Sequence, residues 1–439
     1  MKKVVKFGGS SLASAEQVKK VGDIVRADES RIYVVPSAPG KRFAKDTKVT
    51  DLLYQCYDAA VAGGEEFQTI LTEIKSRYQE IITGLKIKLS LEEEFAVIEK
   101  KFMERAGSDY AASRGEYLNG IVVAKYLGYE FIDAASVIFF DEDGNFDADK
   151  TDKILSRKLK STERAVIPGF YGSLPNGQIK TFSRGGSDVT GSIVAKAGKV
   201  DIYENWTDVS GFLTADPRIV DNPDPISIIT YKELRELSYM GASVLHEDAI
   251  FPVRQANIPI NIKNTNAPQD PGSLIVSETS RRPKHVITGI AGKKGFTSVN
   301  IEKDMMNSEV GFGRKVLQAF EDCGVNFEHM PSGIDTMTVF VHQDEFEPQE
   351  QKVLAAINRT AKPDAIDIEV DLALIAVVGR GMKSSHGTAA KIFKALAQEH
   401  INIKMIDQGS SELNIIIGVK NEDFETAIRS IYKIFVEEE

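Results

Sequence analysis

An apolar strand that stops at two glycines and opens into a helix begins the sequence and constrains its fold more than any other feature. Residues 4–7 favour a buried strand, and residues 13–26 have helical spacing. Ser10 or Ser11 is expected to cap that helix. The glycines at 8–9 would leave backbone N–H groups and a helix N-terminus facing one point, which suits a phosphate. Glycine pairs also serve tight turns that bind nothing, so both interpretations stay open at this stage.

A second strand at residues 31–35 ends in a loop rich in proline and glycine, which gives the order strand, helix, strand. This order predicts a parallel sheet covered by helices. The loop continues as a basic segment, residues 41–50, which is either a lid over the glycine turn or a solvated surface loop. From residue 51 to about residue 127 the apolar spacing is helical. Within that region the charged segment 113–116, judged by its residues alone, is typical of a solvated helix turn.

The opening pattern is repeated at residues 184–188, where Arg-Gly-Gly-Ser-Asp precedes a helical segment at 189–197. Two such turns in one α/β chain can face one polyanion from two sides, which strengthens the phosphate interpretation. A strand at 200–205 follows, and the Thr-Asp pair at 207–208 stands at its end, where ligands bind in open α/β sheets. Trp206, the only tryptophan, is expected in the core.

The composition is typical of a soluble globular protein, and its charge argues against some classes of partner. The chain has 439 residues, of which 42% are hydrophobic and 27% charged, with a net charge of −10. Negative charge without a basic run argues against a nucleic-acid partner, and no segment approaches the length of a membrane span. Cys56 and Cys323 lie far apart, as expected in a reducing cytoplasm without disulfides. We therefore expect a cytoplasmic protein.

Beyond about residue 285 the sequence contains an internal repeat with a constant offset of 76 residues. Segments 311–320, 325–327 and 339–341 align with segments 387–396, 401–403 and 415–417. Each copy follows the order strand, glycine turn, helix, strand, turn, strand, helix, which is the ferredoxin-like βαββαβ order. Such a repeat can form a pocket for a small zwitterion or a dimerisation platform, and the two roles are compatible.

These motifs together resemble the aspartokinases, a family of amino-acid kinases with tandem ACT regulatory domains. The resemblance covers nearly the whole chain and depends on the two repeats together with Lys6-Phe7-Gly8-Gly9-Ser10-Ser11, Arg184-Gly185-Gly186-Ser187-Asp188, Trp206-Thr207-Asp208-Val209 and Asp216-Pro217-Arg218. It implies an α/β fold with an amino-acid-kinase (carbamate-kinase-like) parallel-sheet sandwich plus two ferredoxin-like βαββαβ ACT domains. The implied boundaries are 1–283 for the kinase domain, 284–370 for the first ACT domain and 371–439 for the second. A strand exchange between the two ACT domains is an option.

The resemblance also implies a reaction and assigns residues to it. ATP would phosphorylate the side-chain carboxylate of L-aspartate to give 4-phospho-L-aspartate, the first step of the aspartate-derived pathway to lysine, threonine and methionine. Mg²⁺ would bridge ATP oxygens, and no protein side chain is assigned to a metal. The implied catalytic residues are Lys6 and Asp188, with Asp188 orienting Lys6. The implied ATP-binding residues are Lys6, Gly8, Gly9, Ser10, Thr207, Asp208, Leu213, Arg218 and Ser243. The implied aspartate-binding residues are Ser37, Thr50, Glu116 at the ammonium group, Arg184 at the carboxylate, and Ser187.

One segment departs from the family pattern. Relatives commonly have a lysine in the sequence Gly-Ala-Lys-Val-Leu-His-Pro, and that lysine meets the nucleotide phosphates. Here segment 241–247 is Gly-Ala-Ser-Val-Leu-His-Glu, with Ser243 in place of the lysine. Because serine cannot neutralise a phosphate, either another cation replaces it, with Arg218 as the first candidate, or the nucleotide site is weaker.

The tandem ACT repeats imply feedback inhibition by an amino-acid end product. The implied effector-binding residues are Met306, Ser308, Gly311, Phe312, Gly313, Asn326, Glu328 and Ser332. Glu328 favours a ligand with an amino group, so lysine is preferred over threonine, although a solvated carboxylate is the commoner role for such a residue. A homodimer or homotetramer formed through the ACT domains is expected. Another amino-acid kinase and a catalytically weak amino-acid sensor are the alternatives, and only Ser243 favours the sensor.

Overall fold

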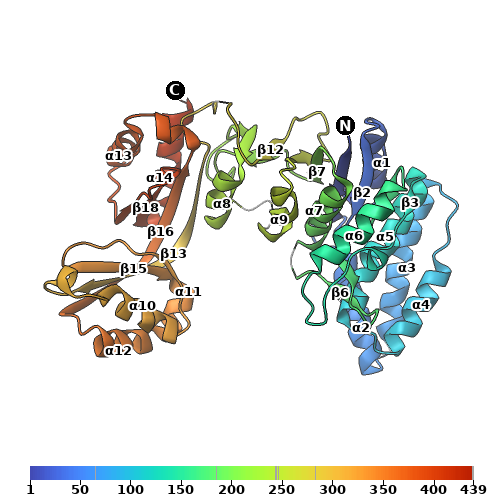
Figure 1. Ribbon diagram of the computed structural model, residues 1–439, viewed down its shortest axis with the longest axis horizontal. Coiled ribbons are helices and arrows are strands. Elements are labelled where there is room, and N and C mark those ends of the chain that lie inside the picture. The colour runs from blue at the N-terminus through green and yellow to red at the C-terminus, as the bar shows by residue number, and fades with distance from the viewer. Residues whose placement is uncertain (65, 184, 243–244, 246, 282, 438–439) are drawn as a thin grey trace. The chain divides into compact units, whose positions relative to one another are not determined.

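The computed structural model describes residues 1–439 except positions 65, 184, 243–244, 246, 282 and 438–439, and the chain forms two compact units (Figure 1). Unit 1 contains Met1–Phe212, Ser227–Tyr231 and Val244–Thr279. Unit 2 contains Leu213–Ile226, Lys232–Ser243 and Ser280–Glu439. Each unit has its own sheet and its own core.

Unit 1 is built on an eight-stranded, mostly parallel sheet, as the strand–helix–strand order predicts. Its strand order is β10 (Ile228–Thr230), β12 (Ser273–Val276), β11 (Ile260–Asn264), β7 (Ile202–Thr207), β1 (Lys3–Phe7), β2 (Arg31–Pro36), β4 (Ala165–Val166) and β3 (Glu130–Phe131). Only the pair β11–β12 is antiparallel. Because β1 lies between β7 and β2, Phe7 at its end is in register with Trp206 and Pro36. The carboxyl ends of three central strands therefore meet at one edge, where open α/β sheets bind ligands.

Helices cover both faces of this sheet (Figure 1). One group shares a core with β1 and β2 and consists of α1 (Ala15–Arg26), α2 (Val49–Ala62), α3 (Glu66–Leu85), α4 (Glu92–Met103) and α5 (Ser108–Leu127). The other group consists of α7 (Gly186–Gly198), which packs on β1 and β7, flanked by α6 (Ala148–Lys160) and α9 (Glu247–Gln255). Trp206 is fully buried and stacks on Phe7 with ring centroids 6.0 Å apart, which confirms its place in the core. None of the described helices combines the length and the apolar character that crossing a bilayer requires.

The N-terminal turn has the predicted order, but its helix begins later than expected. Gly9–Leu12 forms a short 3₁₀ turn, and Ser14 caps α1, its side chain accepting a backbone hydrogen bond at 3.4 Å. The prediction that Ser10 or Ser11 caps the helix is therefore wrong. Ser11 is buried, and its hydroxyl lies 2.8 Å from that of Thr265, just after β11. This contact fixes the glycine turn to the neighbouring part of the sheet.

Unit 2 is built on one six-stranded antiparallel sheet that both repeats share. Its strand order is β14 (Phe327–His329), β15 (Thr336–His342), β13 (Gly289–Glu302), β16 (Ala365–Val378), β18 (Asn414–Lys420) and β17 (Met405–Asp407). The two central strands, β13 and β16, are 14 residues long. Residues 289–294 of β13 pair with 373–378 of β16, and residues 298–302 pair with 365–369. Each central strand thus runs from one repeat into the other.

The repeats have matching helices and matching glycine turns. The helices are α10 (Phe312–Asp322) and α12 (Glu350–Thr360) in the first repeat, and α13 (Thr388–Gln398) and α14 (Phe424–Tyr432) in the second. Gly311 precedes α10 with φ +84°, and Gly387 precedes α13 with φ +82°. Left-handed backbone at this position favours glycine. The sequence repeat at an offset of 76 residues therefore corresponds to a structural repeat.

Two segments that precede residue 280 in the sequence belong to unit 2. They include β9 (Pro225–Ile226), paired with β8 (Phe212–Leu213), and most of α8 (Tyr231–Tyr239). Glu233 of α8 is fully buried, accepts a hydrogen bond from Thr288 at 2.5 Å and pairs with Arg380 at 3.0 Å. Asn414 donates to Glu236 on the next turn of the helix at 2.6 Å. Helix α8 is therefore held to the repeats by buried polar contacts as well as by apolar packing.

Candidate functional site

The two glycine turns of unit 1 meet at an ion pair between β1 and α7. Lys6 stands one residue before the end of β1, in register with Asn205 of β7. Its Nζ lies 2.6 Å from Oδ1 of Asp188, in the first turn of α7. Asn205 donates from Nδ2 to the same oxygen at 2.8 Å. Because Lys6 is only 7% exposed, this network holds its ammonium group at a fixed position near the strand end.

The backbone of the first turn offers fewer amides than predicted. The N–H of Gly8 donates to the carbonyl of Trp206 at 3.0 Å, so it is not available to a phosphate, contrary to the prediction. Within the described part of the chain, the N–H groups of Gly9 and Ser10 donate to no acceptor. The carbonyl of Gly9 accepts from the N–H of Gly40 at 2.8 Å, and a Cβ on Gly9 would lie 3.3 Å from the Gly40 Cα. Glycine at position 9 thus permits the close approach of the loop after β2.

Helix α5 carries a buried carboxylate and a buried amide that face this same loop. Glu116 is 5% exposed and accepts a hydrogen bond from the backbone N–H of Ala38, and burial raises its pKa to about 8. Asn119, one turn later, donates from Nδ2 to the carbonyl of Ser37 at 2.6 Å. Oε2 of Glu116 and Oδ1 of Asn119 are buried and accept no hydrogen bond from any described residue. Two such acceptors leave room for a donor from a ligand, and an ammonium group has the right charge and three N–H bonds.

The turn that carries Glu116 is buried, so the solvated helix turn expected from its residues alone is wrong. Gly115 allows the helix to approach closely, since a Cβ there would lie 2.8 Å from the Cβ of Ala38 and 3.7 Å from the hydroxyl oxygen of Thr50. Its carbonyl accepts from the hydroxyl of Tyr78 at 2.7 Å. The structure therefore brings together, around Gly115, three predicted aspartate-binding residues: Ser37 after β2, Thr50 of α2 and Glu116 of α5.

The basic loop between β2 and α2 is anchored by a buried arginine. Arg77 of α3 is 2% exposed and donates to Asp46 at 3.1 Å, to the carbonyl of Thr47 at 3.2 Å and to that of Gly40 at 2.9 Å. Arg42 also pairs with Asp46 at 2.9 Å. Hydrogen bonds from Arg42, and then the charge of Arg77, lower the pKa of the Asp46 carboxyl. The inner side of the loop is thus fixed, whereas Arg42 and its basic neighbours are exposed.

The predicted nucleotide residues fall in both units. Thr207 and Asp208 lie at the carboxyl end of β7, beside the strand that carries Lys6, and their side chains are 3.2 Å apart. Leu213 and Arg218 belong to unit 2. Arg218 is 88% exposed and pairs with Asp216 at 2.6 Å, which lowers the pKa of that carboxyl. Arg218, the candidate replacement for the lysine that relatives have at position 243, therefore already has an acidic partner.

Two predicted residues, Arg184 and Ser243, lie outside the described residues. Ser187, at the start of α7, is 9% exposed, and a Cβ on Gly169 would lie 2.6 Å from its hydroxyl oxygen. In the part of the chain that the structure describes, no group of three or more His, Cys, Asp or Glu side chains is arranged to hold a metal ion.

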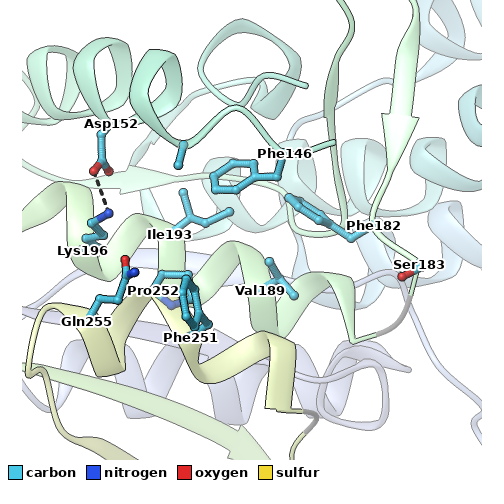
Figure 2. Close-up of a pocket in the computed structure, with 11 residues that line it drawn as sticks. Phe146, Asp152, Phe182, Ser183, Val189, Ile193, Lys196, Phe251, Pro252 and Gln255 are labelled. Atoms are coloured by element: carbon cyan, nitrogen blue, oxygen red, sulfur yellow. Dashed lines mark ion pairs between the residues drawn. The ribbon is translucent and has the colours of Figure 1, made fainter. Parts of the chain in front are cut away.

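A cavity of about 320 Å³ lies beside α7, and none of the described residues that are predicted to bind ATP or aspartate line it. Figure 2 shows Phe146, Phe182 and Phe251 around it, with Val189 and Ile193 of α7 between them. At one end Lys196 of α7 pairs with Asp152 of α6 at 2.9 Å. The cavity walls are mainly apolar, and the charges at its end already neutralise each other.

The predicted effector residues lie in the first repeat of unit 2, in different environments. Met306 and Phe312 are buried in the core of that repeat, so only their backbone is available to a ligand. A Cβ on Gly313 would lie 3.0 Å from the Cε of Met337. The exposed members of the set are Ser308, Gly311, Asn326 and Ser332. The side chain of Glu328 is only 8% exposed and lies 3.2 Å from His342, so it is not the solvated carboxylate that is the commoner case.

Sequence reasoning missed two side chains of the site in unit 1. Asn119 stands three residues after Glu116, hence one helical turn further, and this spacing could have identified it. Asn205 stands directly before Trp206 at the end of a strand, beside the strand that carries Lys6. Only the strand order places Asn205 next to Asp188, and the sequence does not contain that order.

A parallel sheet whose glycine turns hold a buried lysine, together with a shared ferredoxin-like double repeat, defines an amino-acid kinase with ACT domains. The sequence profile of the amino acid kinase family matches residues 1–264, and that of an ACT domain matches residues 375–435. Aspartokinase 3 of Bacillus subtilis (strain 168) is 40% identical over 448 residues, which cover 99% of this chain and 98% of that protein.

Solved structures agree with this similarity. The crystal structure of Clostridium acetobutylicum aspartate kinase is 54% identical, with a TM-score of 0.91 over 99% of this chain and 100% of that chain. The structure of E. coli aspartokinase III in complex with aspartate and ADP, 23% identical, has the same fold, with a TM-score of 0.72 over 99% of both chains. The chain belongs to the aspartokinase family and is an aspartate kinase with ACT regulatory domains.

Proposed function

We propose that unit 1 transfers the γ-phosphoryl group of ATP to the side-chain carboxylate of L-aspartate, giving 4-phospho-L-aspartate. The observation that carries this proposal is the pair of buried, unsatisfied acceptors on Glu116 and Asn119, which face the loop after β2, the strand that pairs with the one carrying the fixed ammonium of Lys6. The acceptors suit the substrate's ammonium group, and Lys6 suits an anionic phosphate. The complex of E. coli aspartokinase III with aspartate and ADP is consistent with this choice of substrates.

Aspartate would bind with its ammonium group between Glu116 and Asn119, next to the loop that carries Ser37 and the helix that carries Thr50. A protonated Glu116 cannot form this ion pair, so binding of the ammonium group would favour the ionised form of its carboxyl. Arg184 would bind the α-carboxylate, because a planar guanidinium suits a carboxylate. Ser187 would lie beside it at the start of α7.

The transfer itself needs no general base. An oxygen of the substrate carboxylate, already ionised at neutral pH, forms a bond to the γ-phosphorus, while the bond from that phosphorus to the bridging oxygen of ADP breaks. Lys6 would neutralise charge on the transferred group, and Asp188 and Asn205 would fix its position. The free N–H groups of Gly9 and Ser10 would donate to phosphate oxygens. Thr207 and Asp208 at the end of β7 would also contact the nucleotide. The family resemblance further assigns Leu213, Arg218 and Ser243 to nucleotide binding.

Mg²⁺ would be carried largely by the nucleotide. Mg²⁺ at ATP sites usually keeps several waters and is held through the phosphate oxygens and one or two carboxylates. When bound it would neutralise phosphate charge.

Unit 2 would bind an amino-acid effector and inhibit the kinase, in the pathway that leads from aspartate to lysine, threonine and methionine. The buried carboxylate of Glu328 favours lysine over threonine, because lysine offers a second ammonium group. The structure of E. coli aspartokinase III with lysine and aspartate is of the same fold and suggests this type of ligand. A homodimer or homotetramer through the ACT domains is part of the proposal.

The test is an assay that traps acyl phosphate with hydroxylamine. Hydroxamate should form only when both ATP and L-aspartate are present, and lysine should inhibit it more strongly than threonine. Hydroxamate formed from glutamate or acetylglutamate in preference to aspartate would favour another amino-acid kinase. No product with any of these acceptors, together with tight lysine or threonine binding, would favour a sensor.

A further inference from the structure

Glu328, the carboxylate proposed to bind the effector's amino group, already has a neutral partner from α8. The hydroxyl of Tyr239 donates to Oε2 of Glu328 at 2.5 Å. His342 of β15 approaches the other oxygen, Oε1, at 3.2 Å. All three residues belong to unit 2. Both carboxylate oxygens therefore have partners, in contrast to the half-satisfied carboxylate of Glu116.

The ring of Tyr239 is not held in place by burial. It is 56% exposed, and Nζ of Lys293 lies 5.5 Å from the ring centroid. Partial burial of the hydroxyl, and then its bond to Glu328, raise the pKa of Tyr239, so the group stays a proton donor at physiological pH. The bond to Glu328 therefore holds the Tyr239 side chain, whereas the helix end itself is held by buried Leu237 and Met240.

Tyr239 is the last residue of α8, and the chain beyond it is closely tied to the helix end. The N–H of Gly241 donates to the carbonyl of Ser238 at 3.0 Å, and that of Ala242 donates to the carbonyl of Leu237 at 3.0 Å. Gly241 has φ +102°, the left-handed backbone that ends helices. The backbone at the helix end is therefore held independently of the Tyr239 side chain, which can exchange its partner.

We propose that the hydroxyl of Tyr239 occupies the place on Glu328 that the effector's ammonium group takes, so that effector binding displaces the Tyr239 side chain. The inference rests on the proposed role of unit 2 as an effector-binding unit. An ammonium group is the stronger partner for a carboxylate than a neutral hydroxyl, so the exchange favours the ligand once it is present.

The sign of one mutational effect tests this competition. Tyr239→Phe removes the competing hydroxyl and keeps the ring, so L-lysine should bind to the full-length protein about 10- to 150-fold more tightly, measured by calorimetry, since one hydrogen bond to a charged group no longer opposes it. The half-inhibiting lysine concentration in the hydroxamate assay should fall with it. Tyr432→Phe is the matched control, because its hydroxyl accepts from the N–H of Asp224 and has no bond to Glu328. Glu328→Gln should abolish lysine binding in either background.

Each other outcome overturns the inference in a recognisable way. Unchanged lysine affinity in Tyr239→Phe means that Tyr239 does not compete, and weaker affinity means that it is a partner of the ligand. If the unmodified protein binds neither L-lysine nor L-threonine, the proposed effector role of unit 2 fails, and the competition fails with it. Because Tyr239 is half exposed, the variant should unfold at the same temperature as the unmodified protein, and Tyr239→Leu repeats the test if it does not.

Discussion

Replacing Glu116 by glutamine tests the substrate site through both a magnitude and a pH dependence. With a pKa of about 8, Glu116 is about one-eleventh ionised at pH 7, so ionising it for the substrate costs about 1.4 kcal/mol. Breaking a buried ion pair costs about 3–5 kcal/mol. The net loss in Glu116→Gln is therefore about 1.6–3.6 kcal/mol, a roughly 15- to 450-fold increase in the KM for aspartate at pH 7.

The pH profile carries the sharper test. Because kcat/KM reports the free enzyme, that for aspartate should rise roughly tenfold per pH unit below pH 7 and flatten above pH 8, as the buried carboxyl of Glu116 ionises. In Glu116→Gln this rise should disappear. Glu93→Gln, an exposed carboxylate on α4, is the control and should keep both the profile and the KM. A variant at Glu116 that keeps the rise, or a KM within twofold of the unmodified value, would refute the assignment of the ammonium site.

Three further changes probe other parts of the molecule. Lys6→Ala should lower kcat about 10²- to 10³-fold, as for loss of one preorganised donor. The dissociation constant of aspartate, measured without nucleotide, should stay within about threefold. A near-normal kcat would show that Lys6 does not take part in phosphoryl transfer. Arg77→Met should lower the free energy of unfolding by about 2–4 kcal/mol, because three hydrogen bonds from a charged donor are lost, and should also raise the KM for aspartate. Urea unfolding and steady-state kinetics measure the two effects. Unchanged values would mean that the loop between β2 and α2 does not need Arg77 to hold it in place. Gly311→Ala and Gly387→Ala should each destabilise unit 2 by about 1–2 kcal/mol, because no atom would clash with the new Cβ and only the positive φ is strained; a clear difference between the two in thermal unfolding would contradict their equivalence.

The sequence predicts the parts of this molecule that depend on local pattern. Local sequence patterns of a few residues predict the strand that stops before Gly8, the helix that follows the second glycine turn, and the 76-residue repeat. The structure contains all three. The sequence does not show which groups become buried together. Glu116 looks like part of a charged, solvated turn until Gly115 is seen to let Ala38 approach within contact distance. Likewise, the N–H of Gly8 looks available until β7 is placed beside β1, where Trp206 accepts it.

The two ionisable side chains of the site, Lys6 and Glu116, differ in what they require from a ligand. Lys6 is satisfied before any ligand arrives, since Asp188 neutralises it and Asn205 fixes that partner, so a phosphate would share the ammonium group with an existing carboxylate. Glu116 and Asn119 are the opposite case, because their free acceptors have lost solvent without gaining a donor. A ligand ammonium group would therefore recover a desolvation cost of about 1–3 kcal/mol per acceptor that the folded protein already bears. This difference means that aspartate selectivity should depend on α5, whereas the fixed Lys6–Asp188 pair should affect turnover more than binding.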